Sequence, residues 1–217
     1  MQDYAAQRQN MVESQVRPND VPDPRLQDAM RRVARERFVP ASKRALAYAD
    51  STVEVVPGRY LLDPRSFAKL AQLAGIGAND RVLDVGCATG YSTAVLARLA
   101  QSVTGLEEDA DLVRIASDML AAVGARNATV VQGMLTEGAK SGAPYDVILI
   151  EGAVEEVPER LLAQLGEGGR LAAIVQKGAQ GQARLYVREH GRIGSRAGFN
   201  ATVPLLSGFR QKVGFVF

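Results

Sequence analysis

Residues 81–90, which read Arg-Val-Leu-Asp-Val-Gly-Cys-Ala-Thr-Gly, constrain the fold more than any other stretch of the chain. A short apolar run ends in an acidic residue and continues into a small-residue turn that opens a helix. In a parallel sheet this layout offers backbone N–H groups and a helix N-terminus to a nucleotide-like ligand. Twenty-three positions after Asp84, the run Ser-Val-Thr-Gly-Leu ends in Glu107. A carboxylate at the tip of the next strand is well placed to accept hydrogen bonds from ribose hydroxyls.

From residue 81 onward, apolar runs alternate with helical stretches. The runs lie at 81–85, 102–106, 129–132, 146–150 and 169–175, and the helical stretches at 91–100, 109–122 and 156–165. Continuous apolar runs joined by helices indicate a parallel sheet that is covered on both faces. We therefore predict an α/β fold with a Rossmann-like, doubly wound, mostly parallel sheet.

The chain before this sheet has a helical pattern interrupted by prolines. We predict one helix over 3–16, a second from Pro24 to the Phe38-Val39-Pro40 stop, and a third over 65–75. The second helix has Leu26, Met30 and Val33 on one face. A break at 17–24 separates the first two helices, and an irregular segment at 45–64 precedes the third. Residues 1–75 then form an N-terminal helical extension packed on a core of residues 76–217, within one compact domain. Added C-terminal strands are expected at 184–189 and 212–217, with Phe215-Val216-Phe217 paired into the sheet.

Composition limits the expected partners. The net charge of +2 does not demand a nucleic-acid partner. The charge is uneven, because residues 101–170 hold twelve acidic and five basic residues, whereas residues 176–217 hold seven basic residues and one acidic residue. A solvated basic face explains this asymmetry better than a surface that attracts an anionic substrate, although the second interpretation stays open.

The sequence also predicts a compartment. Cys87 is the one cysteine, so no intrachain disulfide can form, which fits a reducing environment. The N-terminus is polar and lacks the apolar core of a signal peptide, and no run of about 18 apolar residues could span a membrane. We expect a cytoplasmic protein with no membrane or nucleic-acid partner.

The small-residue turn distinguishes three kinds of nucleotide site. A dinucleotide fingerprint would place glycine at positions 86, 88 and 91, but Ala88 and Tyr91 stand at two of them. A phosphate-binding P-loop needs Lys-Ser/Thr after its last glycine, which is absent here. The remaining fit is the first motif of S-adenosylmethionine-dependent methyltransferases, Asp/Glu-x-Gly-x-Gly-x-Gly. Ala88 replaces its middle glycine, a mild departure if that residue has a negative φ. A tight turn without any ligand is the alternative.

A closer resemblance extends beyond this motif. The stretch Met30–Pro40, followed by Ala47-Tyr-Ala-Asp50, resembles the N-terminal region of protein-L-isoaspartate O-methyltransferases. The similarity continues through 81–96, 103–107, 145–158 and 161–171, and so covers nearly the whole chain. It implies the class I methyltransferase fold and transfer of a methyl group from S-adenosylmethionine to a free carboxylate of a protein or peptide, with S-adenosylhomocysteine as product. In this family the acceptor is the abnormal isoaspartyl carboxylate of damaged proteins, whose methylation starts repair.

Two stretches depart from the family. Its substrate loop resembles Gly-His-Gly-Gln-Thr-Ile-Ser-Gln-Pro, whereas residues 56–64 here read Val-Pro-Gly-Arg-Tyr-Leu-Leu-Asp-Pro. Tyr60 and Leu62 replace the two hydroxyl residues, so we expect poor turnover of isoaspartyl peptides unless the Tyr60 phenol substitutes. The family's Gly-Asp-Gly after the third strand reads Gly-Met-Leu at 133–135. Met134 there replaces a carboxylate expected to sense the adenine amine, and it can still pack on adenine through its polarizable sulfur.

The motif and the resemblance together define a candidate site. The catalytic candidate is Tyr60, and the cofactor-binding candidates are Asp84, Gly86, Cys87, Ala88, Gly90, Glu107, Glu108, Gly133, Met134, Leu135 and Glu151. Glu151, at a strand tip, would place negative charge near the sulfonium. We predict no metal, because Glu151, Glu155, Glu156 and Glu159 show no ligand spacing and Pro158 marks a helix start whose dipole explains acidic neighbours.

The expected chemistry leaves one alternative open. A carboxylate acceptor is ionised at neutral pH and needs no general base. We expect the lone His190 to be a surface residue, and we expect Cys87, which has no activating partner nearby in sequence, to be a packing residue. The lack of a base fits a carboxylate acceptor, and it fits equally a cofactor-binding paralogue with lost or changed activity that acts as a binding or regulatory module. A nicotinamide oxidoreductase ranks last, since positions 88 and 91 do not fit.

Overall fold

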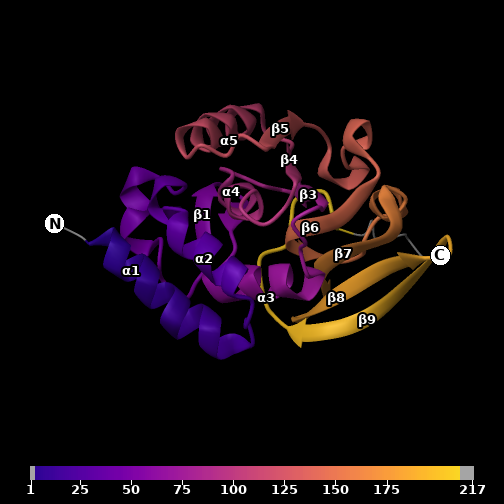
Figure 1. Cartoon of the computed structure of the whole chain (residues 1–217), viewed down its shortest axis with the longest axis horizontal. Helices are drawn as coiled ribbons and strands as arrows, with labels where there is room; N and C mark the ends of the chain where they lie inside the picture. The colour runs from indigo at the N-terminus through magenta and orange to yellow at the C-terminus, as the bar shows by residue number, and fades with distance from the viewer. Residues whose placement is uncertain (1–2, 211–217) are drawn as a thin grey trace, which may run out of the picture.

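The computed structural model describes residues 3–210, and its main feature is a central sheet (Figure 1). Its strands are β3 (Arg81–Val85), β4 (Ser102–Glu107), β5 (Ala128–Gln132), β6 (Tyr145–Val154), β7 (Leu165–Lys177), β8 (Gln180–Glu189) and β9 (Arg192–Asn200). They lie in the order β5-β4-β3-β6-β7-β8-β9. The five strands from β5 to β7 pair in parallel, and β8 and β9 continue the sheet antiparallel. The predicted mostly parallel sheet is confirmed.

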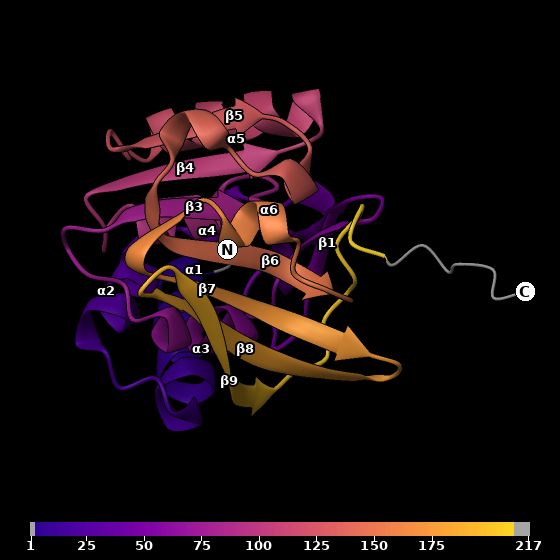
Figure 2. The same cartoon turned by 90° about the vertical axis from the view of Figure 1, so that its right-hand side faces the viewer.

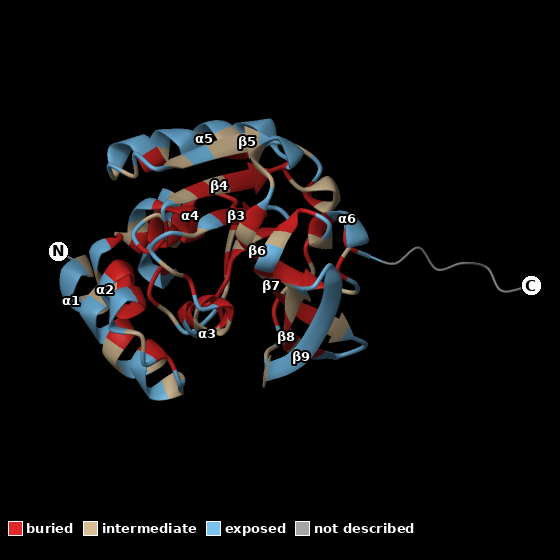
Figure 3. Cartoon of the chain, turned by 45° about the vertical axis from the view of Figure 1, so that its right-hand side comes forward, coloured by how far each residue is buried: buried red, intermediate tan, exposed pale blue. Residues whose placement is uncertain are grey.

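Both faces of the sheet are covered. On one face, alternate strand residues such as Val82 and Val147 pack with α3 (Pro64–Ala74), α4 (Tyr91–Leu96) and α5 (Ala110–Ala122). Their neighbours Leu83 and Ile148 face the other way, as the alternation of a strand requires, and pack with the short α6 (Glu159–Leu162). Figure 3 shows buried strands between these layers. The doubly wound arrangement therefore follows from apolar residues at consecutive strand positions.

The N-terminal region adds helices to the first face. Helix α1 (Tyr4–Met11) continues through a π-helical turn to Val16, so the predicted helix over 3–16 is confirmed. Helix α2 (Pro24–Arg32) starts at Pro24 as predicted, with the Asp23 side chain accepting a hydrogen bond from the Arg25 N–H at 2.8 Å. It ends earlier than expected, because Val33 is already extended, and short 3-10 turns follow at Arg35–Arg37 and Ala41–Leu46. The domain boundary between residues 75 and 76 stays a prediction.

The expectation of an irregular segment at 45–64 is wrong for its second half. Residues Val53–Val56 (β1) and Arg59–Leu61 (β2) form an antiparallel hairpin. Gly58 has a φ of +76° in its turn, which explains why glycine is needed there. Proline and glycine punctuation suggested a loop, but Val53 and Val55 alternate with half-buried residues as a strand does. The hairpin sends Arg59 and Tyr60 to opposite faces.

Other element lengths also differ from expectation. The helix expected at 91–100 ends at Leu96, and the one expected at 156–165 is reduced to Glu159–Leu162. Strand β9 was not predicted, because it is exposed along almost its whole length and carries glycine, serine and arginine rather than an apolar pattern. Figure 2 shows β9 at the opposite edge of the sheet from β5. The strand expected at 184–189 is confirmed as the end of β8, and the one expected at 212–217 lies outside the described residues.

Candidate active site

The small-residue turn lies between β3 and α4, at the carboxyl end of the parallel strands. The N–H groups of Gly86 and Cys87 both donate to the Leu106 carbonyl, at 2.8 and 3.2 Å, which ties the turn to β4. Gly86 and Gly90 have φ values of +80° and +90°, and a Cβ on Gly90 would lie 3.2 Å from the Ala116 methyl. Ala88 has a φ of +49°, so the middle position is left-handed. The sequence argument that alanine is mild there required a negative φ, and that condition is not met: Ala88 carries backbone strain.

Glu107 is fully buried at the end of β4, beside this turn. One carboxylate oxygen accepts hydrogen bonds from the N–H groups of Glu108 and Asp109, at 2.8 and 3.3 Å. The other accepts from the Ala88 N–H at 2.9 Å and from Nη2 of Arg59, with which Glu107 forms a buried ion pair. The strand tip therefore presents a fixed carboxylate to the turn, as the sequence predicted, and a cation already lies against it.

Asp84, near the end of the neighbouring strand β3, is also fully buried. Its Oδ2 accepts hydrogen bonds from the hydroxyls of Ser92 and Thr93, at 2.7 and 2.5 Å, so it anchors the first turn of α4. Its Oδ1 has no hydrogen-bond partner within the described structure. Burial raises the pKa of Asp84 to about 6; the two hydroxyls act in the opposite direction and the charge of Glu107 adds to the rise.

Glu151, on β6, lies on the other side of the turn. Its side chain is buried, and its Oε1 has no hydrogen-bond partner within residues 3–210. Burial raises the pKa of Glu151 well above its usual range, and the charge of Asp84 adds to the rise. A cavity of about 10 Å³ remains beside it, lined by Arg35, Tyr60, Leu61, Leu62, Phe67, Gly86, Cys87, Tyr91, Ser92 and Glu151. The structure thus brings Tyr60 and Glu151 to the same side of the glycine turn, with room between them for at most one water.

Arg35 connects the N-terminal region to this site and was missed by the sequence analysis. It is only 1% exposed, and it donates from Nε to the Ala47 carbonyl and from Nη2 to the Leu62 carbonyl, at 2.7 and 2.6 Å. Its guanidinium lies 4.6 Å from the ring centroid of Tyr91, on α4. The Thr89 hydroxyl makes a parallel link by donating to the Phe38 carbonyl at 2.6 Å. The segments before the sheet therefore hold both the hairpin and the turn in place.

The remaining cofactor candidates surround Glu107. The Gly133 N–H donates to the Glu107 carbonyl at 3.0 Å, and Glu108 is exposed. Met134 is 60% exposed, whereas Leu135 is buried in the core. An exposed thioether at the rim is free to cover a flat ring. Cys87 is buried, and burial raises the pKa of its thiol well above its usual range, so the predicted packing role agrees with its environment.

The space directly over Gly86 is filled by side chains. A Cβ on Gly86 would lie 3.0 and 3.1 Å from the two methyl groups of Leu206 and 3.4 Å from Nη2 of Arg59. Leu206 is held there because the strand-like segment 204–206 bonds to Ala153, with the Leu206 N–H donating to the Ala153 carbonyl at 2.8 Å. The Glu107 carboxylate beside the turn suits the ribose of a nucleoside, but Arg59 must leave Glu107 before ribose hydroxyls can reach it. The sequence analysis missed Arg59 as a site residue, although Arg59 is the one charged residue in the segment 56–62 and this charge was the available signal.

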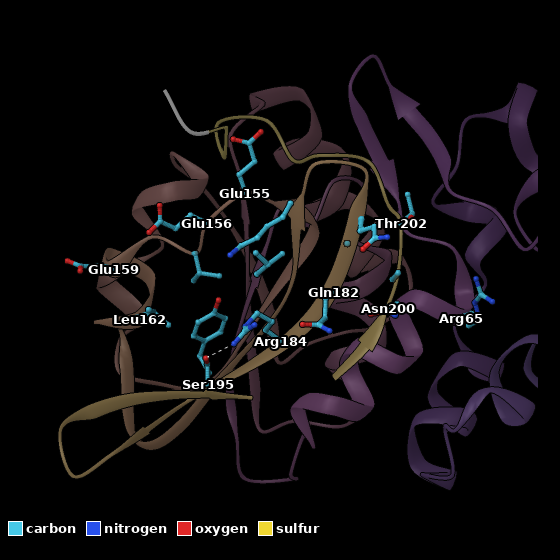
Figure 4. Close-up of a pocket in the computed structure, with 17 residues that line it drawn as sticks. Arg65, Glu155, Glu156, Glu159, Leu162, Gln182, Arg184, Ser195, Asn200 and Thr202 are labelled. Carbon is cyan, nitrogen blue, oxygen red and sulfur yellow. Dashed lines mark hydrogen bonds between the residues drawn. The ribbon is translucent and has the colours of Figure 1, made fainter. Parts of the chain in front are cut away.

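A much larger cavity lies elsewhere. It measures about 1230 Å³ and is a polar groove beside β7, β8 and α6, with Lys177, Arg184, Glu156 and Glu159 among its lining residues (Figure 4). It shares no lining residue with the small cavity at the turn. No group of three or more histidine, cysteine, aspartate or glutamate side chains among residues 3–210 is arranged to hold a metal ion. His190 is exposed at the turn between β8 and β9, as predicted.

Comparisons with known proteins agree with this geometry. The family model for protein-L-isoaspartate(D-aspartate) O-methyltransferase matches residues 6–207. Protein-L-isoaspartate O-methyltransferase 1 of Rhodopseudomonas palustris is 38% identical over 85% of this chain and 75% of its own length. The protein of that name from Methanoculleus marisnigri is 37% identical over 92% of this chain and 87% of its own length.

Solved structures support the fold. A protein-L-isoaspartate O-methyltransferase structure superposes with a TM-score of 0.82 at 24% identity, over 93% of this chain and 66% of the other. A second, described as a protein-L-isoaspartate O-methyltransferase from Plasmodium falciparum in complex with S-adenosyl-L-homocysteine, has a TM-score of 0.79 at 20% identity, over 92% of this chain and 98% of its own. The likeness to these structures shows that the chain has the class I methyltransferase fold, and the match over residues 6–207 shows that it belongs to the protein-L-isoaspartate(D-aspartate) O-methyltransferase family.

Proposed function

We propose that this chain transfers the methyl group of S-adenosylmethionine to the free carboxylate of an isoaspartyl residue in a protein or peptide, leaving S-adenosylhomocysteine. The supporting observation is the buried Glu107 carboxylate, which lies against the backbone of the glycine turn at the carboxyl end of the parallel strands. Relatives that match most of the chain carry the name of this activity. The comparisons give no support to the alternative of a paralogue with lost activity.

The residues around the turn suit the parts of the cofactor. Glu107 would accept the ribose hydroxyls, and Met134 and Leu135 would lie against the adenine. When bound, the cofactor supplies a methyl group on a sulfonium, which is already a good leaving group. Glu151 would place its unpartnered carboxylate oxygen toward this positive charge. The candidates Asp84, Gly86 and Gly90 shape the turn that holds these groups in register.

The protein's main task is then to position the acceptor. A carboxylate acceptor is ionised at neutral pH, so no side chain has to remove a proton. Tyr60 lines the small cavity beside Glu151, and its phenol, which interacts with Glu54 on the neighbouring strand, would have to turn from Glu54 to donate a hydrogen bond to the acceptor carboxylate. The charge of Glu54 raises the pKa of Tyr60, with burial adding to the rise, so the phenol keeps its proton. Holding acceptor and methyl group in line can supply up to about 7–11 kcal/mol of the barrier.

A methyl-transfer assay with radiolabelled S-adenosylmethionine tests this proposal. We expect base-labile methyl ester on an isoaspartyl peptide and none on the same peptide with ordinary aspartate. The Tyr60→Phe variant should lower kcat/KM about tenfold, the value of one positioned hydrogen bond, and leave the affinity for S-adenosylhomocysteine unchanged. No labelled product, together with no calorimetric heat on titration with S-adenosylhomocysteine, would contradict the proposal.

The partners and the compartment of the chain are also proposals. A protein or peptide substrate with a free carboxylate follows from the proposed reaction, and the expectation that neither nucleic acid nor a membrane is a partner rests on the sequence. Within residues 3–210, the structure contains no helix that is both long and apolar enough to cross a membrane. The cytoplasmic location rests on the single cysteine, Cys87, whose thiol is free.

A further inference from the structure

The guanidinium of Arg59 occupies the position from which a nucleoside would approach Glu107. Arg59 is only 8% exposed although it lies in a surface hairpin, because its side chain turns inward from β2 to the end of β4. Its Nη2 bonds Glu107 Oε2, the same oxygen that accepts the Ala88 N–H. It also lies 3.4 Å from the position of a Cβ on Gly86, directly over the turn.

Glu107 has no remaining capacity for ribose while this ion pair exists. A carboxylate offers about four acceptor positions, and four donors already use them: three backbone N–H groups and Arg59. The three N–H groups belong to the rigid end of β4 and to the turn. Arg59 is the one donor of the four that a side-chain rotation can remove.

The ion pair is also poorly satisfied on the side of Arg59. Its Nε and Nη1 are buried without hydrogen-bond partners within the described structure. Buried donors that lack partners carry a desolvation penalty, which is relieved when the side chain moves into water. The ion pair therefore holds Arg59 over the turn, while the desolvation penalty of its two unpartnered donors favours the release of the side chain into water.

We propose that Arg59 is an intramolecular competitor for the cofactor site, and that its release from Glu107 sets the affinity for the cofactor. This inference rests on the proposed function. Ribose hydroxyls and the Arg59 guanidinium use the same carboxylate, so each bound nucleoside requires one broken ion pair. Arg59 and Tyr60 are adjacent in β2, so the competing guanidinium and the candidate acceptor-binding phenol belong to the same hairpin.

Three variants separate the charge of Arg59 from its size. Arg59→Met keeps the length and removes the charge, Arg59→Gln removes the charge and shortens the side chain, and Arg59→Lys keeps the charge. Arg65→Gln is the matched control, because Arg65 is exposed on α3 and does not line the cavity at the turn. Titration calorimetry with S-adenosylhomocysteine gives the affinities. Urea unfolding without ligand, for Arg59→Met, Glu107→Gln and the double variant, measures the ion pair independently of cofactor.

We expect Arg59→Met and Arg59→Gln to bind S-adenosylhomocysteine about tenfold more tightly than the parent, as for a site that is open about a tenth of the time. Arg59→Lys should stay near the parent, and Arg65→Gln should equal it. Without ligand, each single variant should lower the urea midpoint. The sum of these two decreases should exceed the decrease caused by the double variant. Equal or weaker binding by Arg59→Met and Arg59→Gln would overturn the proposal. If the parent shows no binding and Arg59→Met binds, the competition is supported, and the proposed function fails for the parent chain. If neither binds while the ligand-free coupling is present, the ion pair exists but both the competition and the proposed function fail.

Discussion

Replacing Arg35 with methionine tests how the N-terminal region supports the site. The side chain is buried among the 3-10 turns that follow α2 and reaches three separate segments of the chain. It bonds the Ala47 and Leu62 carbonyls and stacks on Tyr91. Methionine has a similar length and can fill the same volume, so the substitution removes the charge and the donors with little change in packing.

The expected loss of stability follows from these contacts. Two buried carbonyls lose charge-assisted donors, at about 1–3 kcal/mol each. The stacking on Tyr91 contributes about 1–2 kcal/mol more. Part of this loss is offset, because a buried guanidinium carries a desolvation penalty that methionine lacks. We expect a net decrease of about 3 kcal/mol in the free energy of unfolding, a large share of the roughly 5–15 kcal/mol typical of a domain.

Urea unfolding followed by circular dichroism measures this change. Arg37→Met is the matched control, since Arg37 lies in the same 3-10 turn but is exposed, and it should change the free energy of unfolding by less than about 0.5 kcal/mol. The backbone at Leu62 should also exchange its amide protons faster in Arg35→Met. Equal stability of the two variants would refute the claim that Arg35 holds the hairpin against α4.

Three further predictions follow from buried groups near the turn. The pKa of Asp84 is about 6 in the folded chain and ordinarily 3.8, so the folded form holds this proton more tightly than the unfolded form. The free energy of unfolding should therefore fall by up to about 3 kcal/mol as the pH rises from about 4 to 6. Asp84→Asn should flatten this pH dependence in urea titrations. Gly86→Ala should lower the free energy of unfolding by about 1–3 kcal/mol, and by more than Gly58→Ala, because both glycines have positive φ but only a Cβ on Gly86 would meet neighbours. The raised pKa of Glu151 predicts that the affinity for S-adenosylmethionine, relative to S-adenosylhomocysteine, increases with pH as the carboxyl ionises beside the sulfonium; calorimetry at several pH values should show this increase in the parent and not in Glu151→Gln.

The sequence predicted the sheet and the turn because both depend on local patterns. Continuous apolar runs identified strands β3 to β7, and the glycines at 86 and 90 identified the point where β3 passes into α4. Strand β9 could not be predicted in this way, because an exposed edge strand needs hydrogen bonds from its neighbour and no apolar face. Burial of Arg35 and Arg59 was equally out of reach, since arginine is rarely buried and its partners here lie far away along the chain.

Charge balance at the carboxyl end of the sheet explains why these arginines are buried. Asp84, Glu107 and Glu151 are three buried carboxyl groups. The charge of Glu107 contributes to the raised pKa of Asp84, the charge of Asp84 contributes to the raised pKa of Glu151, and Arg35 opposes the rise at Glu151. Arg35 and Arg59 supply two positive charges near these three carboxyl groups. The excess of negative charge is relieved by a proton on the carboxyl group whose pKa is raised most. A sulfonium ligand carries the positive charge that this arrangement lacks. Arg59 can then leave Glu107, because the ribose hydroxyls of the ligand replace its hydrogen bond to Glu107 and the sulfonium places a positive charge beside Glu151.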